Sequence, residues 1–473
     1  MPPAARENGA LADAAMLQTR LRRPVAAGFS YASAEVGGQL IFCVVSFYLL
    51  KFYTDVYGIS AVAAGSILLF ARCIDAVDAP VWGIIFDKTK SRWGKSRPWF
   101  LRLCVPFAIS GVLTFTTFPL RYREKIIYAA ATYVICSVLY TGINTPVTAI
   151  LASLTSDTRE RVRLTSFRMF GSKLGVLFVN LTLLAMVGLF GHGNLRMGFS
   201  RVMLFYACGS ICLFLIAFRN LEEKVQETTH RLTVKESLLS LRGNIPWWIT
   251  FISSFAFWIA FTARIVTAPY FFQYVLHREN WISIANSMDV ISLGSIALMP
   301  WFYRFMHKQT VWAAGLTGCV FGQLLLFVGL VQSSFLWVMA GWSFGFLCSG
   351  VAMAMPFSIL SDCVDYGEWK HGIRAAGFLS AVGAAFCLKA GSGIGGALPA
   401  WIMSAYHYVP DVAQSTEALK GIDLGCVWLP AIAYALAIVP VLFYRRYEQM
   451  EAKIQDELSI RRITDSMTQT CKE

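Results

Sequence analysis

Charged residues are scarce in this sequence of 473 residues, and acidic residues are scarcer than basic ones. Only 15% of the residues are Asp, Glu, Lys or Arg, and 56% are hydrophobic, whereas a soluble protein carries about 25% charged residues. So few charges cannot cover one or two soluble cores, which excludes a disordered protein, a collagen and an ordinary cytosolic enzyme. The composition instead favours a helical protein with many membrane spans.

Metal-binding and catalytic patterns are also missing. The sequence has twelve cysteines but no C-x-x-C motif, and nearly all of them lie inside apolar runs, where they act as small packing residues. Gly391, Gly393 and Gly396 match the letters of a dinucleotide-binding motif, but they lie inside an apolar run without a preceding strand, so close helix packing explains them better. We therefore predict neither an enzyme nor any cofactor beyond a coupling ion.

Long apolar stretches are what the sequence has in abundance. A bilayer core of about 30 Å takes about 20 residues of helix, and twelve stretches are long enough. They are residues 24–54, 58–86, 98–119, 126–153, 164–190, 199–218, 246–275, 282–303, 311–332, 335–360, 375–405 and 422–444. We therefore predict an all-α membrane protein with twelve transmembrane helices.

Lys and Arg are concentrated on one side of this arrangement. The connections on the side of the N-terminus hold 28 of them, those on the other side hold seven, and six lie in spans. By the positive-inside rule, this bias predicts that both termini are cytoplasmic. Residues 1–23 have no apolar run of signal-peptide type, and Arg20, Arg22 and Arg23 flank the first span. Because the net charge of +13 is spread over short loops, we expect no nucleic-acid partner.

The longest connection divides the chain into two halves of six spans. Within it, Thr233-Val-Lys-Glu236 has the pattern of a capping box that opens a short amphipathic helix. Parallel six-helix repeats are typical of one large class of transporters. The predicted organisation is a cytoplasmic tail (1–23), a first bundle (24–218), a linker (219–245), a second bundle (246–444) and a second cytoplasmic tail (445–473).

Two acidic residues lie deep in the second span, where a charge costs about 2.5–3.5 kcal/mol on insertion scales. Asp75 and Asp78 are one helical turn apart, with Arg72 on the same face. Two neighbouring carboxylates in a low-dielectric layer cannot both stay ionised without a positive charge. We therefore predict a site for H⁺ or Na⁺ at Asp75 and Asp78, with Thr141 and Asn144 of the fourth span as further oxygen ligands.

Charges in other spans have two interpretations. Glu35 and Gln39 lie one turn apart in the first span, and Arg264 and Asp289 lie in spans seven and eight. Such residues either face a functional cavity or pair with one another to lock helices together. Helix locking is the better interpretation for Arg264 and Asp289. For Glu35, both interpretations stay open.

Five stretches carry a resemblance to a known family. They are Phe52-Tyr-Thr-Asp-Val-Tyr-Gly58, Ala71-Arg-Cys-Ile-Asp-Ala76, Asp87-Lys-Thr-Lys-Ser-Arg-Trp-Gly-Lys-Ser-Arg-Pro98, Tyr140-Thr-Gly-Ile-Asn-Thr-Pro146 and Asp362-Cys-Val-Asp-Tyr-Gly-Glu-Trp-Lys-His-Gly-Ile-Arg374, which is followed by Lys389. With them the chain resembles the glycoside–pentoside–hexuronide:cation symporters, a branch of the major facilitator superfamily, over almost its whole length. The resemblance implies a pseudo-symmetric 6+6 major facilitator fold in a bacterial inner membrane.

The resemblance also implies which residues bind the cation and the substrate. The cation site would use Asp75, with Thr141 nearby. In a family member the second acid lies four residues after the first, where this chain has Ala79. Here the second acid is Asp78, one residue earlier. This change favours H⁺ over Na⁺. Implied substrate-binding residues are Glu35, Gln39, Asn144, Thr148, Arg168 and Lys389. Arg168 and Lys389 would suit an anionic sugar such as a hexuronide, or they only balance the buried acids.

Two charged loops are candidates for gates, because ion pairs at the cytoplasmic mouth can form and break as access changes. The first loop places Asp87 near Arg92 and Arg97. The second brings together Asp362, Asp365, Glu368 and Arg374.

The predicted function is import of a sugar or glycoside, such as a hexuronide or pentoside, by symport with H⁺ or Na⁺. We expect the protein to work as a monomer in the lipid bilayer. The alternative is a transporter of the same fold for a non-sugar amphiphile such as a lysolipid or drug, because Thr148 and Met353 stand where a family member has pocket tryptophans. A membrane enzyme or sensor would need a catalytic constellation or a soluble domain, and no connection is longer than 219–245.

Overall fold

The computed structural model is built from long helices. It describes residues 24–89, 91–94, 96–154, 158–221, 223, 241–302, 305–372, 379, 383, 386–410, 412–451, 453–458 and 460. Helices suit the apolar runs because a helix pairs its own backbone N–H and C=O groups, which have no water to bind inside a bilayer. The first tail and the predicted linker helix lie outside the described residues.

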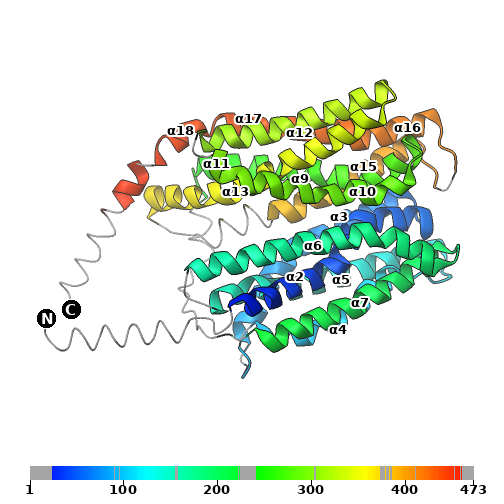
Figure 1. The fold of residues 1–473 in the computed structure, drawn as a ribbon, viewed down its shortest axis with the longest axis horizontal. Helices are drawn as coiled ribbons and strands as arrows, with labels where there is room; N and C mark the ends of the chain where they lie inside the picture. The colour runs from blue at the N-terminus through cyan, green and yellow to red at the C-terminus, as the bar shows by residue number, and fades with distance from the viewer. Residues whose placement is uncertain are drawn as a thin grey trace. The chain divides into compact units, whose positions relative to one another are not determined.

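The chain divides into two compact units (Figure 1). The first unit comprises residues 1–63 and 73–229, and the second comprises residues 64–72 and 230–473. Part of the second predicted span therefore counts with the second unit, where a Cβ on Gly65 would lie 2.8 Å from the Cβ of Ala400. The domain boundaries given above stay predictions.

The first unit consists of helices that pack along their lengths. They are α2 (Pro24–Lys51) with its π-helical continuation η1 (Phe52–Val56), α3 (Ala61–Lys88), α4 (Arg97–Thr114), α5 (Tyr122–Leu154), α6 (Thr158–Gly191) and α7 (Leu195–Asn220). Helix α2 packs mainly on α6 and α7, and α4 packs on α5 and α7. Small residues permit the closest approach, since a Cβ on Gly171 of α6 would lie 2.8 Å from the carbonyl oxygen of Ala32 on α2.

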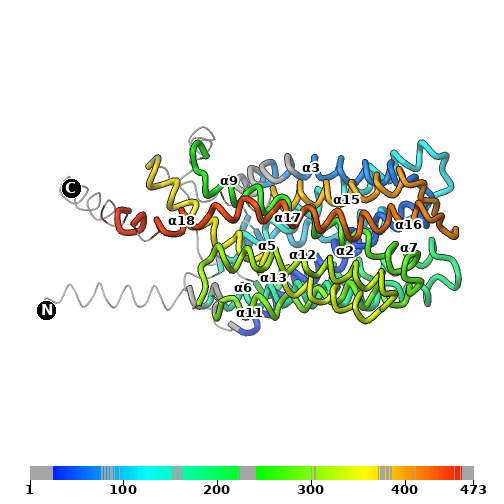
Figure 2. The backbone as a smooth tube through the Cα atoms, turned by 90° about the horizontal axis from the view of Figure 1, so that it is seen from above, coloured from blue at the N-terminus to red at the C-terminus, as the bar shows by residue number. Residues whose placement is uncertain are grey.

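The second unit has more interruptions. Its elements are α9 (Ile245–Tyr270), η2 (Phe271–Val275), η3 (Glu279–Trp281), α10 (Ile282–Ser287), η4 (Met288–Ile291), α11 (Ser292–Phe302), α12 (Lys308–Val331), α13 (Phe335–His371), α15 (Cys387–Ala405), α16 (Thr416–Asp423), η6 (Leu424–Trp428), α17 (Leu429–Leu442) and α18 (Arg445–Glu448). Helix α18 continues beyond the end of α17 (Figure 2). The 3₁₀ turn η4 divides predicted span eight, a break that the hydropathy pattern did not predict.

Nine helices in the described residues are long and apolar enough to cross a membrane. The other three predicted spans correspond to α3, α4 and α15. Helix α3 is as long as α2, but it carries Arg72, Asp75 and Asp78 in its middle turns. Helices α4 and α15 have 18 and 19 residues, so each is near the minimum length for a span.

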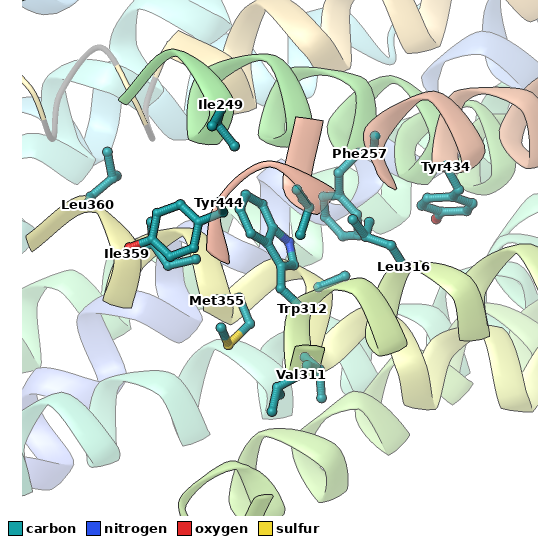
Figure 3. Close-up of a cluster of buried hydrophobic side chains, with 14 of the residues drawn as sticks. Ile249, Phe257, Val311, Trp312, Leu316, Met355, Ile359, Leu360, Tyr434 and Tyr444 are labelled. Carbon is teal, nitrogen blue, oxygen red and sulfur yellow. The ribbon is translucent and has the colours of Figure 1, made fainter. Parts of the chain in front are cut away.

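A hydrophobic core holds four helices of the second unit together (Figure 3). Trp312 of α12, Met355 of α13, Phe257 of α9 and Tyr434 of α17 all belong to it and are almost completely buried. Because α9 and α17 are far from α12 and α13 in the sequence, the core fixes where the ends of these helices lie. It thereby positions the charged residues at the start of α12 and the end of α13.

Candidate functional site

The two acids of α3 are buried, as the cation-site prediction requires. Asp75 is 1% exposed and Asp78 is 8% exposed. The hydroxyl of Ser137 on α5 donates a hydrogen bond of 2.7 Å to Oδ2 of Asp75. Thr141 lies one turn further along α5, is also buried, and its hydroxyl donates to the carbonyl oxygen of Ser137 at 3.3 Å. Carboxylate, hydroxyl and carbonyl oxygens are thus gathered here, and such oxygens are suitable ligands for a hard cation.

Sequence reasoning missed Ser137. Its position four residues before Thr141 places both on one face of α5, and this spacing is the signal that could have found it. Asn144 is half-buried on the same helix, and its side chain makes no hydrogen bond to any residue that the structure describes. Its role as a cation or substrate ligand stays a prediction. Thr148 is exposed, and its hydroxyl donates to the backbone carbonyl of Asn144 at 3.2 Å.

The substrate-site residues of α2 and α6 form one polar cluster. Nε of Arg168 lies 2.8 Å from Oε2 of Glu35, in an ion pair that is mostly shielded from solvent. The side-chain amide of Gln39 donates to Oε1 of Glu35 at 3.3 Å and to the hydroxyl of Ser172 at 3.1 Å. The tyrosine ring of Tyr31 lies 6.0 Å from the guanidinium carbon of Arg168. The positive charge of Arg168 is therefore balanced within the first unit, and Gln39 keeps its carbonyl oxygen as an acceptor.

Lys389 belongs to the second unit. It lies on α15 and is half-buried, and its backbone carbonyl accepts a hydrogen bond of 2.9 Å from Ser392. Met353, at one of the two pocket positions, is half-buried on α13. Lys389 stays a predicted substrate contact.

The guanidinium of Arg264 on α9 packs against two aromatic rings. Arg264 is 1% exposed, and Nη2 donates to the carbonyl oxygen of Trp342 at 2.5 Å. Its guanidinium carbon lies 4.3 Å from the ring centroid of Trp342 and 4.5 Å from that of Phe346. Only glycine fits at position 345, because a Cβ there would collide with Nη1 of Arg264. Asp289, in η4, is close enough for electrostatic attraction to this guanidinium. The geometry fits the helix-locking interpretation of the sequence.

The predicted second charged loop is instead helical over most of its length, because α13 continues to His371, and Asp362 takes part in an ion-pair network there. Nζ of Lys308, the first residue of α12, lies 2.8 Å from Oδ2 of Asp362 and 2.9 Å from Oε1 of Glu451. The hydroxyl of Tyr444 donates to the same Oδ2 of Asp362 at 3.1 Å. Glu448 accepts a hydrogen bond of 2.6 Å from the backbone N–H of Lys308. The sequence pointed to Asp362 but not to Lys308 or to the two glutamates.

The other predicted gating residues of the second unit are only partly described. Asp365 lines a small cavity together with Asp362 and Glu451. The backbone carbonyl of Glu368 accepts the hydrogen bond of 2.8 Å from Gly372 that ends α13. Arg374 lies outside the described residues.

In the first unit, the arginines contact helix ends and rings. Nε of Arg97 donates to the carbonyl oxygen of Phe218 near the C-terminal end of α7, at 2.5 Å. The carboxylate of Glu223 accepts from the backbone N–H of Arg97 at 2.8 Å, where an acid favours the helix N-terminus. The guanidinium carbon of Arg92 lies 4.7 Å from the ring centroid of Trp93. The side chain of Asp87 is not among those described, so its ion pairs stay predictions.

The family of the chain follows from comparison of its sequence with known families. Residues 30–446 match the sequence profile of the family described as MFS/sugar transport protein. The chain belongs to this family. Its resemblance to major facilitator sugar–cation symporters is therefore confirmed, and it is a transporter rather than an enzyme.

Relatives of this sugar transporter span almost its full length. It is 37% identical to the isoprimeverose transporter of Lactiplantibacillus pentosus, over 91% of this chain and 90% of that protein. It is 30% identical to a proposed sulfoquinovose importer of Escherichia coli (strain K12), over 96% and 97% of the two chains. It is 30% identical to the inner membrane symporter YicJ of the same organism, over 88% and 90%. The chain is accordingly a sugar symporter with many spans in the inner membrane.

Solved structures agree on the fold. A bacterial homologue of the human lysosomal transporter Spinster superposes with a TM-score of 0.66 at 12% identity, covering 91% of this chain and 97% of that one. A D-xylose–proton symporter gives a TM-score of 0.65 at 15% identity, covering 89% and 97%. The predicted twelve-helix major facilitator fold is thus confirmed, and the orientation of its termini stays a prediction.

Proposed function

We propose that this symporter imports a neutral sugar together with H⁺ or Na⁺, with the cation bound at Asp75 and Asp78. The observation that carries the choice of a neutral sugar is the ion pair between Glu35 and Arg168. The sequence alone left open whether Arg168 grips an anionic sugar or only balances an acid. The 2.8 Å contact favours the second interpretation.

Three residues of the first unit disfavour an anionic substrate through their charges and hydrogen-bonding groups. An anionic sugar would have to be stripped of water, and a buried carboxylate or sulfonate needs a strong cationic partner in return. Arg168 has already given its charge to Glu35. Gln39 offers a carbonyl oxygen, which accepts a hydrogen bond from a sugar hydroxyl but repels an anion. The similarity to an isoprimeverose transporter supports this choice, and isoprimeverose is the first substrate to test.

Coupling to a cation supplies the driving force for import. Moving one positive charge inward across 100 mV yields about 2.3 kcal/mol, which concentrates a neutral solute roughly 50-fold at 1.4 kcal/mol per decade. The hydrogen bond from Ser137 orients one oxygen of Asp75 and brings no charge of its own. Imposed Na⁺ or pH gradients in membrane vesicles decide which ion is used.

The substitution Glu35→Gln tests the charge argument. It keeps the size of the side chain but releases the positive charge of Arg168, so the substrate preference should shift about tenfold toward anionic sugars (one decade is about 1.4 kcal/mol). The measurement is uptake of radiolabelled isoprimeverose into vesicles, with glucuronide and sulfoquinovose as competitors. Unlabelled isoprimeverose, which is neutral, should inhibit uptake by the parent far better than the anionic glucuronide and sulfoquinovose. A lysolipid should not compete.

The matched control is Ser172→Ala, which removes a contact of Gln39 without changing any charge. It should leave the ratio of neutral to anionic inhibition as it is in the parent. If the parent already takes anionic sugars as well as neutral ones, the assignment of a neutral substrate is wrong, whatever the variants do.

A further inference from the structure

A groove of about 550 Å³ opens on the second unit where α9 begins and α17 is followed by α18. Apolar side chains from both helices form its walls, and one cation stands among them. The residues that line the groove include Ile245, Ile249, Leu442, Phe443, Arg446 and Tyr447. Leu442 is 57% exposed and Phe443 is 67% exposed, which is typical of side chains that face lipid tails.

The groove lies at the end of the bundle that the distribution of Lys and Arg predicts to be cytoplasmic. Trp248, one turn into α9, is exposed, and tryptophan is enriched at the level of lipid headgroups. The groove therefore runs from the headgroup layer into the apolar layer. A molecule that fills it must have a polar end near Arg446 and an apolar body.

Arg446 brings a positive charge to the mouth of the groove. In the part of the chain that the structure describes, Arg446 makes no ion pair. The carboxylates that follow it are engaged elsewhere, because Glu448 caps α12 at the backbone of Lys308 and Glu451 pairs with the Lys308 side chain. The groove also begins at the N-terminal end of α9, where the helix dipole places a partial positive charge.

We propose that this groove binds a phospholipid with an anionic headgroup, taken from the inner leaflet. One acyl chain lies against Ile249 and Leu442, and the phosphate of the headgroup contacts Arg446. A cation at the mouth of an apolar groove between transmembrane helices is complementary to such a lipid. The surrounding membrane presents these lipids at high local concentration.

Native mass spectrometry of the purified full chain tests the proposal. The protein in detergent is titrated with phosphatidylglycerol and, separately, with phosphatidylcholine. Phosphatidylglycerol should bind more tightly, and Arg446→Gln should weaken its binding about tenfold. The matched control is Arg445→Gln, which removes the same charge from the preceding residue outside the groove and should weaken binding less than twofold. Leu442→Trp, which narrows the groove, should weaken the binding of both lipids.

Several results would overturn the proposal. Equal losses for Arg446→Gln and Arg445→Gln would show a diffuse surface charge and no site. Equal affinity for the two lipids would remove the role of the headgroup charge. Displacement of the lipid by free glycerol phosphate would assign the groove to a small soluble anion, and a second copy of the chain that displaces lipid would make it a protein interface.

Discussion

The two units bury their charges in different ways. In the first unit, Asp75 accepts a hydrogen bond from a small hydroxyl, and Glu35 forms an ion pair whose arginine is partly open to solvent. In the second unit, the guanidinium of Arg264 is held between two aromatic rings and a backbone carbonyl, with a glycine making room for it. A carboxylate can exchange a small polar partner for an ion or a sugar hydroxyl. The guanidinium of Arg264 could bind a ligand only if the packed aromatic rings around it moved apart. The difference supports the proposal that the first set of charges binds the ion and the sugar, and that the second holds helices together.

The largest effect is expected from Asp75→Asn. The amide cannot supply the negative charge that holds a cation, so sugar accumulation driven by a potential of 100 mV should fall from roughly 50-fold to none, while exchange of sugar across the vesicle membrane continues. Uptake in vesicles with and without an imposed gradient measures both. Ser137→Ala removes one hydrogen bond to a charged group, worth about 1.5–3 kcal/mol, and should have a smaller effect of about tenfold or slightly more. Full accumulation by Asp75→Asn would remove the distinction between the two units.

A medium effect is expected from Gly345→Ala, which places a methyl group against Nη1 of Arg264. Overpacking of this kind costs about 1–3 kcal/mol, so the melting temperature of the protein in detergent should fall. Arg264→Met in the same chain removes the collision and should restore most of the loss. Uptake per folded molecule should stay near the parent level for Arg264→Met. If it drops as far as it does for Asp75→Asn, then Arg264 belongs to the transport machinery.

The smallest effect is expected from Glu451→Gln, which breaks the pairing of Lys308 with the C-terminal segment. The pair is partly exposed, so the loss of stability should be at most about 1 kcal/mol. The control is Lys453→Gln, since Lys453 lies 3.9 Å from Glu457 in an exposed pair and should contribute almost nothing. Thermal melting at low and high salt compares the two variants, and equal shifts would show that the Lys308 network has no special role.

Sequence patterns predicted the fold better than the contacts. Hydropathy and the placement of Lys and Arg depend on short stretches, so the spans and the acids of α3 could be recognised without the structure. Glu35 and Arg168 were each singled out, but their ion pair joins residues 133 positions apart. No local pattern encodes that pairing, which decides whether the arginine is available to an anionic substrate.

The residues that were missed share a physical reason. A serine inside a span commonly bonds back to its own helix, so the spacing between Ser137 and Thr141 does not by itself show that Ser137 contacts α3. Lys308 was explained by the positive-inside rule, and that sufficient explanation concealed its partners. Residue types identify which side chains are expensive to bury, but tertiary packing decides what they contact.

The contact between Glu448 and the start of α12 has a consequence for how the protein is made. The backbone N–H of Lys308 donates its hydrogen bond to a carboxylate that is 140 residues further along the chain. During synthesis, α12 therefore enters the membrane with its first turn uncapped, and the cap arrives only when translation is nearly finished. A truncation after Tyr444, or a bulky fusion placed close behind it, should leave an otherwise complete transporter with one helix unfinished at its first residue.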